Sequence, residues 1–156
     1  MMIIETREDD DHALVAGLAP RGLRAADSPV ADPPVLAMLC GLAARIRGSF
    51  TPASWLIVED GELVGMCSIT HAPKDGVVDI GYGVAPTRQR RGIASRAIGD
   101  VVAWAMADPR VRRLTADTAT GNGASQQVLE RNGFVAMGER VDAEDGPLIY
   151  WQRDCV

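Results

Sequence analysis

The stretch Val77-Val-Asp-Ile-Gly-Tyr-Gly-Val-Ala-Pro-Thr-Arg-Gln-Arg-Arg-Gly-Ile-Ala94 joins three patterns that together indicate one kind of site. An apolar strand pattern leads into a basic turn, a glycine follows, and a long apolar helix pattern then begins. The first N–H groups of a helix have no partner within the helix, and the helix dipole favours negative charge there. Glycine lets a ligand approach the backbone, and arginine adds charged donors. The stretch therefore predicts a site for a phosphate-bearing ligand.

Read alone, the same turn also fits a solvated basic turn that caps an ordinary helix. Two other phosphate-binding motifs are excluded. The sequence has no G-x-x-x-x-G-K-S/T motif. The strands before the turn follow one another as a meander, whereas the dinucleotide fingerprint needs a parallel β-α-β start.

Composition sets the broad class. With 156 residues, of which 47% are hydrophobic and 24% charged, the chain is predicted to form one globular domain over residues 1–156. A net charge of −5 argues against nucleic acid as a partner. The three cysteines are odd in number and lack metal-ligand spacing, so we expect reduced thiols, a cytoplasmic protein and no metal. No signal-peptide pattern or apolar run of membrane length occurs, so we expect no membrane partner.

Hydrophobic periodicity and turn residues predict a mixed α/β order. The predicted strands are 2–6, 54–59, 62–70, 77–84, 113–118, 134–141 and 148–153. The predicted helices are 12–18, 35–47, 93–108 and 124–131. Residues 54–84 read as an antiparallel meander, and residues 19–34 read as a proline-rich loop.

Two motifs resemble one enzyme family. The run Gln89-Arg90-Arg91-Gly92-Ile93-Ala94 fits the Q/R-x-x-G-x-G/A acyl-CoA signature of the GNAT N-acetyltransferases. About thirty residues later, Asn122-Gly-Ala-Ser-Gln-Gln-Val-Leu-Glu-Arg-Asn-Gly-Phe134 fits their second motif, N-x-x-S-x-x-V/L-L-x-x-x-G-F. The resemblance covers roughly residues 55–151, and Ser125 with the following Val-Leu-Glu run resembles the ribosomal-protein N-acetyltransferase branch. It implies a mostly antiparallel sheet of about six to seven strands with helices on both faces.

The resemblance implies that acetyl-CoA lies between two splayed strands, here those that end at Val84 and Thr118. The backbone of 82–84 is expected to pair with the pantetheine arm, and an N–H near Val84 to polarise the thioester carbonyl. Asn122 is expected to hydrogen-bond the arm, although Asn-Gly also suits a plain turn before a helix. The implied cofactor-binding residues are Tyr82, Val84, Gln89, Arg90, Arg91, Gly92, Ile93, Ala94 and Asn122. Arg88 is near enough to add charge.

An acceptor amine must lose a proton before it can attack, so a general base is needed. Relatives carry an acidic residue immediately before an Ile-Gly-Tyr run, which implies Asp79 as the base. An outward-facing strand carboxylate is an equally good reading of Asp79, and a family bulge in this strand can change which side chains face the site. Further candidates, each also readable as a surface residue, are Glu62, His71, Glu139 and Glu144.

The leaving thiolate of coenzyme A needs a proton donor. Relatives use a tyrosine at the position of Leu129, and the resemblance implies that Ser125 replaces it. Ser125 can instead be an early-helix cap, and Tyr82 is a second hydroxyl that can equally be a half-buried strand aromatic. The acidic runs at 9–11 and 142–145 read as solvated loops, but at the mouth of an acceptor site they favour a cationic amine.

These observations predict an enzyme that transfers acetyl from acetyl-CoA to a primary amine, on a small molecule or a protein N-terminus, by direct attack. Cys67 lies in a strand without a paired base, so no covalent step is expected. Two alternatives stay open: a non-catalytic acyl-CoA sensor, and an interaction domain that uses the fold as a scaffold. A monomer and a homodimer are both compatible with the sequence.

Overall fold

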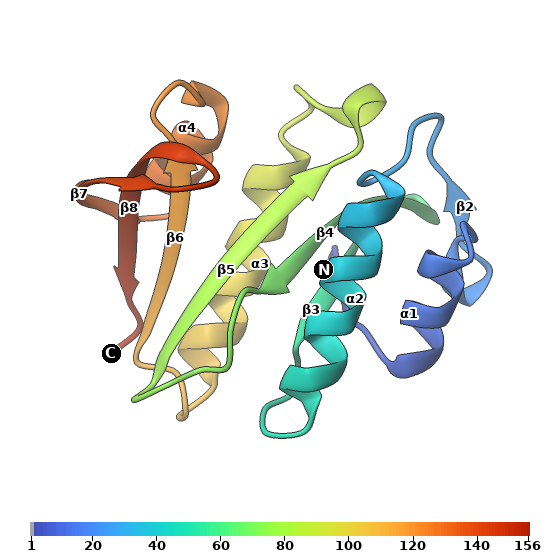
Figure 1. Cartoon of the computed structure of the whole chain (residues 1–156), viewed down its shortest axis with the longest axis horizontal. Helices are drawn as coiled ribbons and strands as arrows, with labels where there is room; N and C mark the ends of the chain where they lie inside the picture. The colour runs from blue at the N-terminus through green and yellow to red at the C-terminus, as the bar shows by residue number, and fades with distance from the viewer. Residues whose placement is uncertain (1) are drawn as a thin grey trace.

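An antiparallel meander forms the centre of the fold, as the sequence predicts (Figure 1). Its strands are β3 (Ser54–Glu59), β4 (Glu62–Ile69) and β5 (Val77–Val84). The β3–β4 turn consists of Asp60 and Gly61, with φ values of 51° and 76°. Positive φ at both positions is what a two-residue hairpin turn requires, and glycine tolerates it without strain.

The computed structural model describes residues 2–156, and the meander extends on both sides into one mixed sheet. The order of the long path is β1-β3-β4-β5-β6-β8-β7. The added strands are β1 (Ile3–Glu5), β6 (Arg113–Ala119), β7 (Val135–Asp142) and β8 (Gly146–Asp154). An eighth strand, β2 (Arg24–Ala25), pairs with β4 and was not predicted, because two residues within a loop carry no periodic signal. The mixed, mostly antiparallel α/β fold is confirmed.

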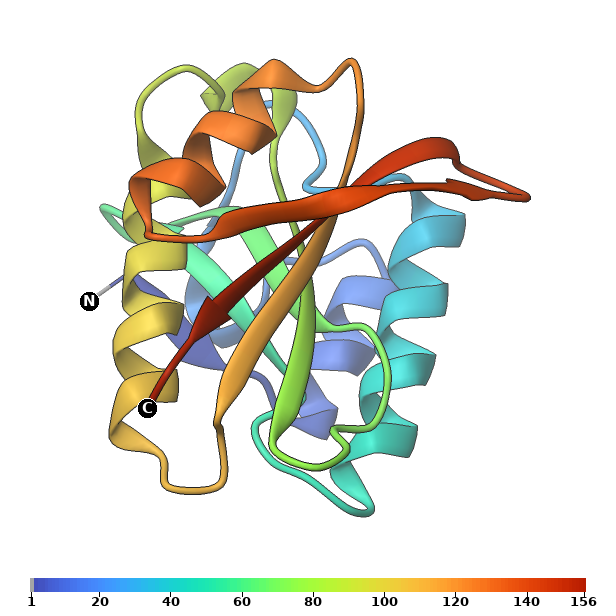
Figure 2. The same ribbon diagram turned by 90° about the vertical axis from the view of Figure 1, so that its left-hand side faces the viewer.

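Helices cover both faces of the sheet (Figure 2). The long helices are α1 (Glu8–Val15), α2 (Pro33–Arg47), α3 (Ile93–Ala107) and α4 (Gly123–Arg131). The pair α1 and α2 packs on one face, where Leu14, Leu36 and Leu56 belong to one buried cluster. The helix α3 packs on the other face, where Ile57 and Ile93 share a second cluster. Within residues 2–156, no helix is long and apolar enough to cross a membrane.

The two central strands β5 and β6 separate along their length (Figure 1). They pair in parallel only at residues 77–79 and 113–115. Beyond that point β5 stays with β4, and β6 stays with β8. The result is a V-shaped gap inside the sheet, which is the splay that the resemblance implies.

The backbone of β5 beyond the splay is available on its open side. The N–H of Thr70 donates to the Asp79 carbonyl and the N–H of Ala85 donates to the Val64 carbonyl, so the odd-numbered residues of β5 bond toward β4. Alternation along a strand then directs the N–H and C=O groups of Tyr82 and Val84 into the gap. The register between β4 and residues 80–84 has no shift, so the bulge considered for this strand does not occur.

The structure corrects the prediction that the acidic run at residues 9–11 is a solvated loop. The helix α1 begins at Glu8, before the predicted start at residue 12, and it includes the acidic run that was read as a solvated loop. Asp10 and Asp11 are buried because Arg21 and Arg47, remote in sequence, neutralise them. Burial alone raises the pKa of Asp10, but hydrogen bonds from Arg21 and from the backbone N–H of Arg7 outweigh it and hold that pKa below 3.8.

Candidate active site

The basic turn that was predicted to bind a phosphate leads directly into the start of α3. Gly92 is the N-cap of this helix with φ 72° and ψ 10°, a left-handed conformation that favours glycine. The first backbone hydrogen bond of the helix runs from the Arg96 N–H to the Gly92 carbonyl oxygen. The N–H groups of residues 93–95 therefore have no partner within the helix. A Cβ atom on Gly92 meets no heavy atom within 4 Å. The helix N-terminus therefore faces open space in which an anion can lie.

A cavity of about 500 Å³ begins at this helix N-terminus, the predicted phosphate cradle, and runs between β5 and α4. Its lining includes the sequence-predicted residues Tyr82, Val84, Gln89, Arg90, Gly92, Ile93, Ala94, Asn122 and Ser125. It also includes Gly83, Arg88 and Val128 from the predicted stretches, together with four residues that the sequence did not single out, namely Ser95, Ala124, Gln127 and Arg131. Arg91 is exposed but does not line the cavity. The structure thus brings together the two motifs, which are about thirty residues apart in sequence.

The basic turn contains three arginines, Arg88, Arg90 and Arg91, and a fourth, Arg96, lies at the start of α3. Arg88 is held by Glu62 and Asp27, and Arg96 is paired with Glu59. Arg88 therefore anchors the turn to β4 and to the loop before α2. Glu62 is equally engaged, since hydrogen bonding from Arg88 lowers its pKa, and it is no candidate base.

Two arginines remain available to an anion in this cavity. Arg90 lines it from the turn and Arg131 lines it from the end of α4, and neither makes an ion pair among residues 2–156. Arg131 was missed because it occupies an unspecified position of the second motif. Its proximity to the cradle depends on how α4 packs against α3, which the sequence does not reveal.

Asn122 has one of the two roles that the sequence left open, the cap of a helix. Its side chain accepts a hydrogen bond of 3.1 Å from the Ser125 N–H, so it is the N-cap of α4. Because Asn122 occupies the cap position, Ser125 is not the helix cap that one reading allowed. The Asn122 amide nitrogen makes no hydrogen bond to a described residue and can still donate into the cavity.

The two candidate hydroxyls lie together across the cavity. The Tyr82 hydroxyl is 2.7 Å from Ser125 Oγ and 3.2 Å from the Ser125 carbonyl oxygen. Burial raises the pKa of Tyr82 to about 12, so the phenol remains a neutral donor at physiological pH. Leu129, where relatives carry a tyrosine, is fully buried in the core and offers no hydroxyl. The pair of Tyr82 and Ser125 is the hydroxyl donor group at this end of the gap.

A second cavity, of about 650 Å³, opens beside the same gap. Side chains alternate between sheet faces, and Tyr82 points toward α4, so Asp79 points to the face of α1 and α2. Asp79 lines this second cavity at the closed end of the splay. Its carboxylate accepts hydrogen bonds from the Thr70 hydroxyl and, at 2.5 Å, from the Thr115 hydroxyl. Both oxygens are thereby held in place.

Asp117 lies in the same cavity, and the sequence reading missed it. It pairs with Arg140 of β7, but its Oδ1 atom is covered and has no hydrogen-bond partner among residues 2–156. Burial is the main cause of a pKa above the ordinary value for Asp117; the Arg140 charge opposes it, and the charges of Asp79 and Asp142 add to it. The sequence did contain one signal for Asp117: polar residues alternate along β6, so Thr115 and Asp117 lie on the same face of the strand.

The other candidate bases differ in position. His71 lines this cavity, and its Nδ1 is 3.0 Å from the Thr70 hydroxyl. Glu139 and Glu144 are exposed and do not line it. Asp142 and Asp145 do line it, so the acidic turn forms part of its rim. Carboxylates outnumber cations along this lining, which favours a positively charged ligand.

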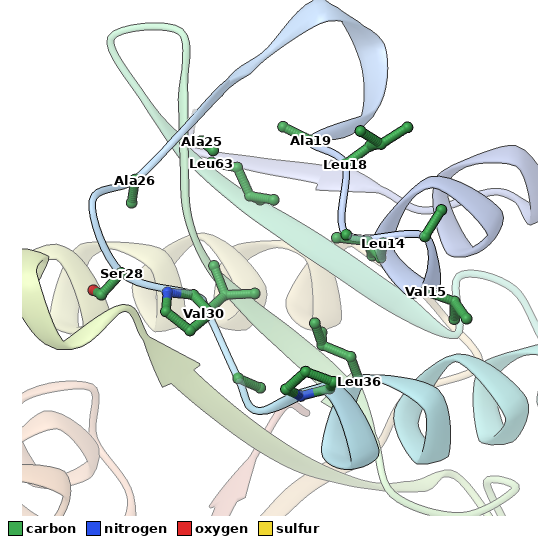
Figure 3. A pocket seen from close by; sticks show the side chains of 15 residues that line it. Leu14, Val15, Leu18, Ala19, Ala25, Ala26, Ser28, Val30, Leu36 and Leu63 are labelled. Carbon is green, nitrogen blue, oxygen red and sulfur yellow. The ribbon is translucent and has the colours of Figure 1, made fainter.

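A third cavity, of about 290 Å³, is apolar and shares no lining residue with the other two (Figure 3). Leu14, Leu36 and Leu63 form its floor from α1, α2 and β4, and Val30 closes it from the loop before α2. None of its lining residues has a charged side chain, so this cavity provides apolar contacts and no acid, base or ion-pairing group.

Comparison with known proteins agrees with this geometry. The family model described as "Acetyltransferase (GNAT) domain" matches residues 23–135. The "Uncharacterized N-acetyltransferase YjdG" of Bacillus subtilis is 32% identical over 85 residues, covering 53% of this chain and 51% of that protein. The "Ribosomal-protein-serine acetyltransferase" of Escherichia coli is 30% identical over 91 residues, covering 58% and 51%. The matches thus span about half the length of these curated relatives.

Among solved structures, the ribosomal L7/L12 α-N-protein acetyltransferase RimL in complex with coenzyme A superposes with a TM-score of 0.74. The superposition covers 99% of this chain and 94% of that one at 20% sequence identity, which supports the same fold. Because the family model covers more than half of the residues, the chain belongs to the GNAT acetyltransferase family.

Proposed function

We propose that the protein is an N-acetyltransferase that moves the acetyl group of acetyl-CoA to a primary amine by direct attack. The observation that carries the proposal is that two cavities border consecutive parts of β5 beside its splay from β6, one from Tyr82 onward and the other as far as Gly81. One contains a helix N-terminus suited to phosphate, and the other is lined by carboxylates suited to an amine. The family and the names of its relatives support the same activity.

The residues of the first cavity fit a coenzyme A group. The free N–H groups at the start of α3 and the side chain of Arg90 suit the pyrophosphate. The open backbone of Tyr82 and Val84 suits an amide-bearing arm that pairs like an added strand. Acetyl-CoA, when bound, supplies an acetyl group already activated as a thioester. We propose these residues, with Gln89, Gly92, Ile93, Ala94, Asn122 and a charge contribution from Arg91, as the cofactor site.

Two groups of this chain are proposed to assist the transfer from the cofactor side. A fixed N–H in the gap, from Tyr82 or Val84, stabilises negative charge that grows on a carbonyl oxygen. Ser125 donates a proton or hydrogen bond to the departing thiolate, and the Tyr82 hydroxyl beside it orients the serine. This pair performs the task that relatives assign to the tyrosine absent at Leu129. The proton that the attacking nitrogen loses as the amide forms replaces the one given to the thiolate.

The acceptor is proposed to enter from the opposite face, where the carboxylate-lined cavity opens. A carboxylate there takes the proton that the amine must lose. Asp79 was predicted for this task and lines the cavity with its oxygens held by Thr70 and Thr115. The relatives named as ribosomal-protein acetyltransferases make a protein N-terminus one acceptor to test, beside small polyamines and aminoglycosides.

The remaining proposals concern the chain as a whole. One sheet includes strands from both ends of residues 3–154, which supports a single catalytic domain. The three cysteines are free and buried, which supports a reducing, cytoplasmic location. A non-catalytic sensor gains no support, because the first cavity contains a pair of hydroxyl donors and the second is suited to an amine.

The direct test is release of coenzyme A thiol from acetyl-CoA in the presence of a panel of amines. The panel contains a peptide with a free N-terminus, a polyamine and an aminoglycoside, with an N-acetylated peptide as the control. We expect thiol release that saturates with one primary amine and is absent with the blocked peptide. Binding of acetyl-CoA without amine-dependent release would favour the sensor, and absence of binding would favour a scaffold.

A further inference from the structure

We propose that Asp117 is the general base that takes the proton from the acceptor's ammonium group. This inference rests on the proposed function, since it assigns a residue to the acceptor side of the same reaction. It differs from the expectation for Asp79, and it adds a residue that neither the motifs nor the sequence reading identified.

The position of Asp117 relative to the splay is the first argument. Asp79 faces Thr115 at the last paired position of β5 and β6. Two residues further along the same parallel register, Asp117 stands across the open gap from Gly81. Gly81 directly precedes Tyr82, whose backbone N–H and C=O point into the gap. Asp117 therefore borders the open part of the gap next to Tyr82, while Asp79 lies at its closed end.

The bonding of the two carboxylates is the second argument. Both oxygens of Asp79 accept hydrogen bonds, one from the Thr70 hydroxyl and one from the Thr115 hydroxyl. Asp117 has one oxygen paired with Arg140 and the other without a partner among residues 2–156. A carboxylate with an unsatisfied, covered oxygen gains more from taking up a proton than one whose oxygens are both hydrogen-bonded.

The charged surroundings of Asp117 give the third argument. Asp79 faces it from β5, Arg140 and Asp142 from β7, and Tyr150 from β8, while His71 and Asp145 lie at the edge of the same cavity. Negative neighbours raise the affinity of Asp117 for a proton, in the same direction as burial. The side chain of Arg140 is 58% exposed, so it can swing toward solvent when an ammonium group replaces it. Two neighbouring carboxylates in different environments commonly divide such roles.

The step is a proton transfer alone. The ammonium R–NH₃⁺ loses one proton to the carboxylate of Asp117, which leaves a neutral amine R–NH₂ and a carboxylic acid. The nitrogen lone pair is then free to attack. The acid returns its proton to water before the next cycle, so one proton is released for each turnover. Asp79 takes no part in this transfer.

The experiment compares the pH dependence of kcat/KM in Asp117→Asn, Asp79→Asn and Glu139→Gln with the wild-type enzyme. Glu139→Gln is the matched control, because it removes one exposed carboxylate from β7 outside the cavity. Acetyl-CoA affinity by calorimetry is measured for each variant and should stay within about twofold of wild type. The acceptor is the amine that gives thiol release with the wild-type enzyme.

We expect a plateau in the wild-type profile between the pKa of Asp117 and that of the amine. Asp117→Asn should lose about 100-fold at neutral pH, and its rate should climb with pH because only free neutral amine reacts. Asp79→Asn should keep the plateau but move its acidic edge to lower pH, because a negative neighbour of Asp117 is gone. Glu139→Gln should match wild type.

A plateau that survives in Asp117→Asn and disappears in Asp79→Asn would overturn the inference and make Asp79 the base. If Asp117→Asn does not fold, carbon-13 NMR titration of the aspartate carboxyls in the wild-type protein decides instead. The Asp117 signal should titrate above the ordinary aspartate value and move to lower pH in Asp79→Asn; a signal at or below the ordinary value would refute the proposal. A wild-type enzyme that turns over no amine would refute the proposed function itself.

Discussion

Replacing Gly92 by aspartate tests the phosphate cradle with little expected effect on the fold. The residue sits at φ 72° as the N-cap of α3, and a Cβ atom there meets nothing within 4 Å. A non-glycine residue in this conformation costs about 1 kcal/mol of stability. A negative charge at a helix N-terminus recovers roughly 0.3–1 kcal/mol of that. The net change in unfolding free energy should therefore stay within about 1 kcal/mol.

The effect on ligand affinity should be much larger. A unit charge about 4 Å from a phosphate charge costs about 4 kcal/mol at an effective dielectric constant of 20. The cradle is open to solvent, so we halve this figure to about 2 kcal/mol, which corresponds to a roughly 30-fold weaker Kd for acetyl-CoA. Calorimetry at constant ionic strength measures the Kd, and thermal unfolding of the same samples measures stability.

Two control variants separate charge from backbone strain. Gly92→Asn places a side chain of the same shape, without charge, at the same position, and should weaken binding far less than Gly92→Asp. Gly17→Asp places the same charge at a glycine with φ 80° and equally open space, outside the cavity. It should lower stability at least as much, because it follows the C-terminus of α1, yet leave affinity unchanged. An unchanged Kd in Gly92→Asp, or equal losses in the two aspartate variants, would refute the cradle.

Three further variants test other parts of the account. Ser125→Ala should lower kcat by about 100-fold and leave acetyl-CoA affinity intact if the hydroxyl protonates the thiolate; full kcat in steady-state assays would reject that role. Arg90→Ala should weaken coenzyme A binding about tenfold, more than Arg91→Ala, because only Arg90 lines the cavity. Equal losses for coenzyme A and its dephospho form are expected if Arg90 contacts the pyrophosphate, whereas a loss for coenzyme A alone would assign Arg90 to the 3′-phosphate. Asp10→Asn should cost about 2 kcal/mol at pH 7 through the lost Arg21 pair. The lowered pKa of Asp10 means that this stability is present above the unfolded pKa of about 3.9 and is lost as pH falls through the lower folded value. Urea unfolding at pH 7 and pH 2 should show the variant's deficit shrink, and a constant deficit would contradict the charge-based explanation.

The parts of the site that could be predicted are those coded within a short stretch. The strand, turn, glycine and helix of residues 77–107 are contiguous, so periodicity and one left-handed glycine were enough to predict the cradle. The hairpin at Asp60 and Gly61 was predictable for the same reason. The second motif predicted α4, and its capping by Asn122 follows from local side-chain chemistry.

The parts that could not be predicted depend on partners far apart in sequence. Asp10 and Asp11 look like solvated acids until Arg21 and Arg47 are folded against them. In the sequence Arg88 looks like a phosphate ligand, but in the fold its guanidinium forms an ion pair with the Glu62 carboxylate. Asp117 is one polar residue on a strand, and only the splay beside β5 brings it to the acceptor cavity. Local sequence patterns determine the helices and strands, whereas the burial and pairing of each ionisable side chain depend on its neighbours in the folded structure.

The measurement that tests the central claim most directly is the fate of a labelled acetyl group in a single turnover. Enzyme in excess is mixed with acetyl-CoA that carries deuterium in its acetyl group, together with the accepting amine, and all products are analysed by mass spectrometry. The account predicts that the label appears on the amine in a one-to-one ratio with free thiol, with no labelled protein at any time. Label in free acetate or on the protein, with none on the amine, would contradict direct acetyl transfer across the splay of β5 and β6.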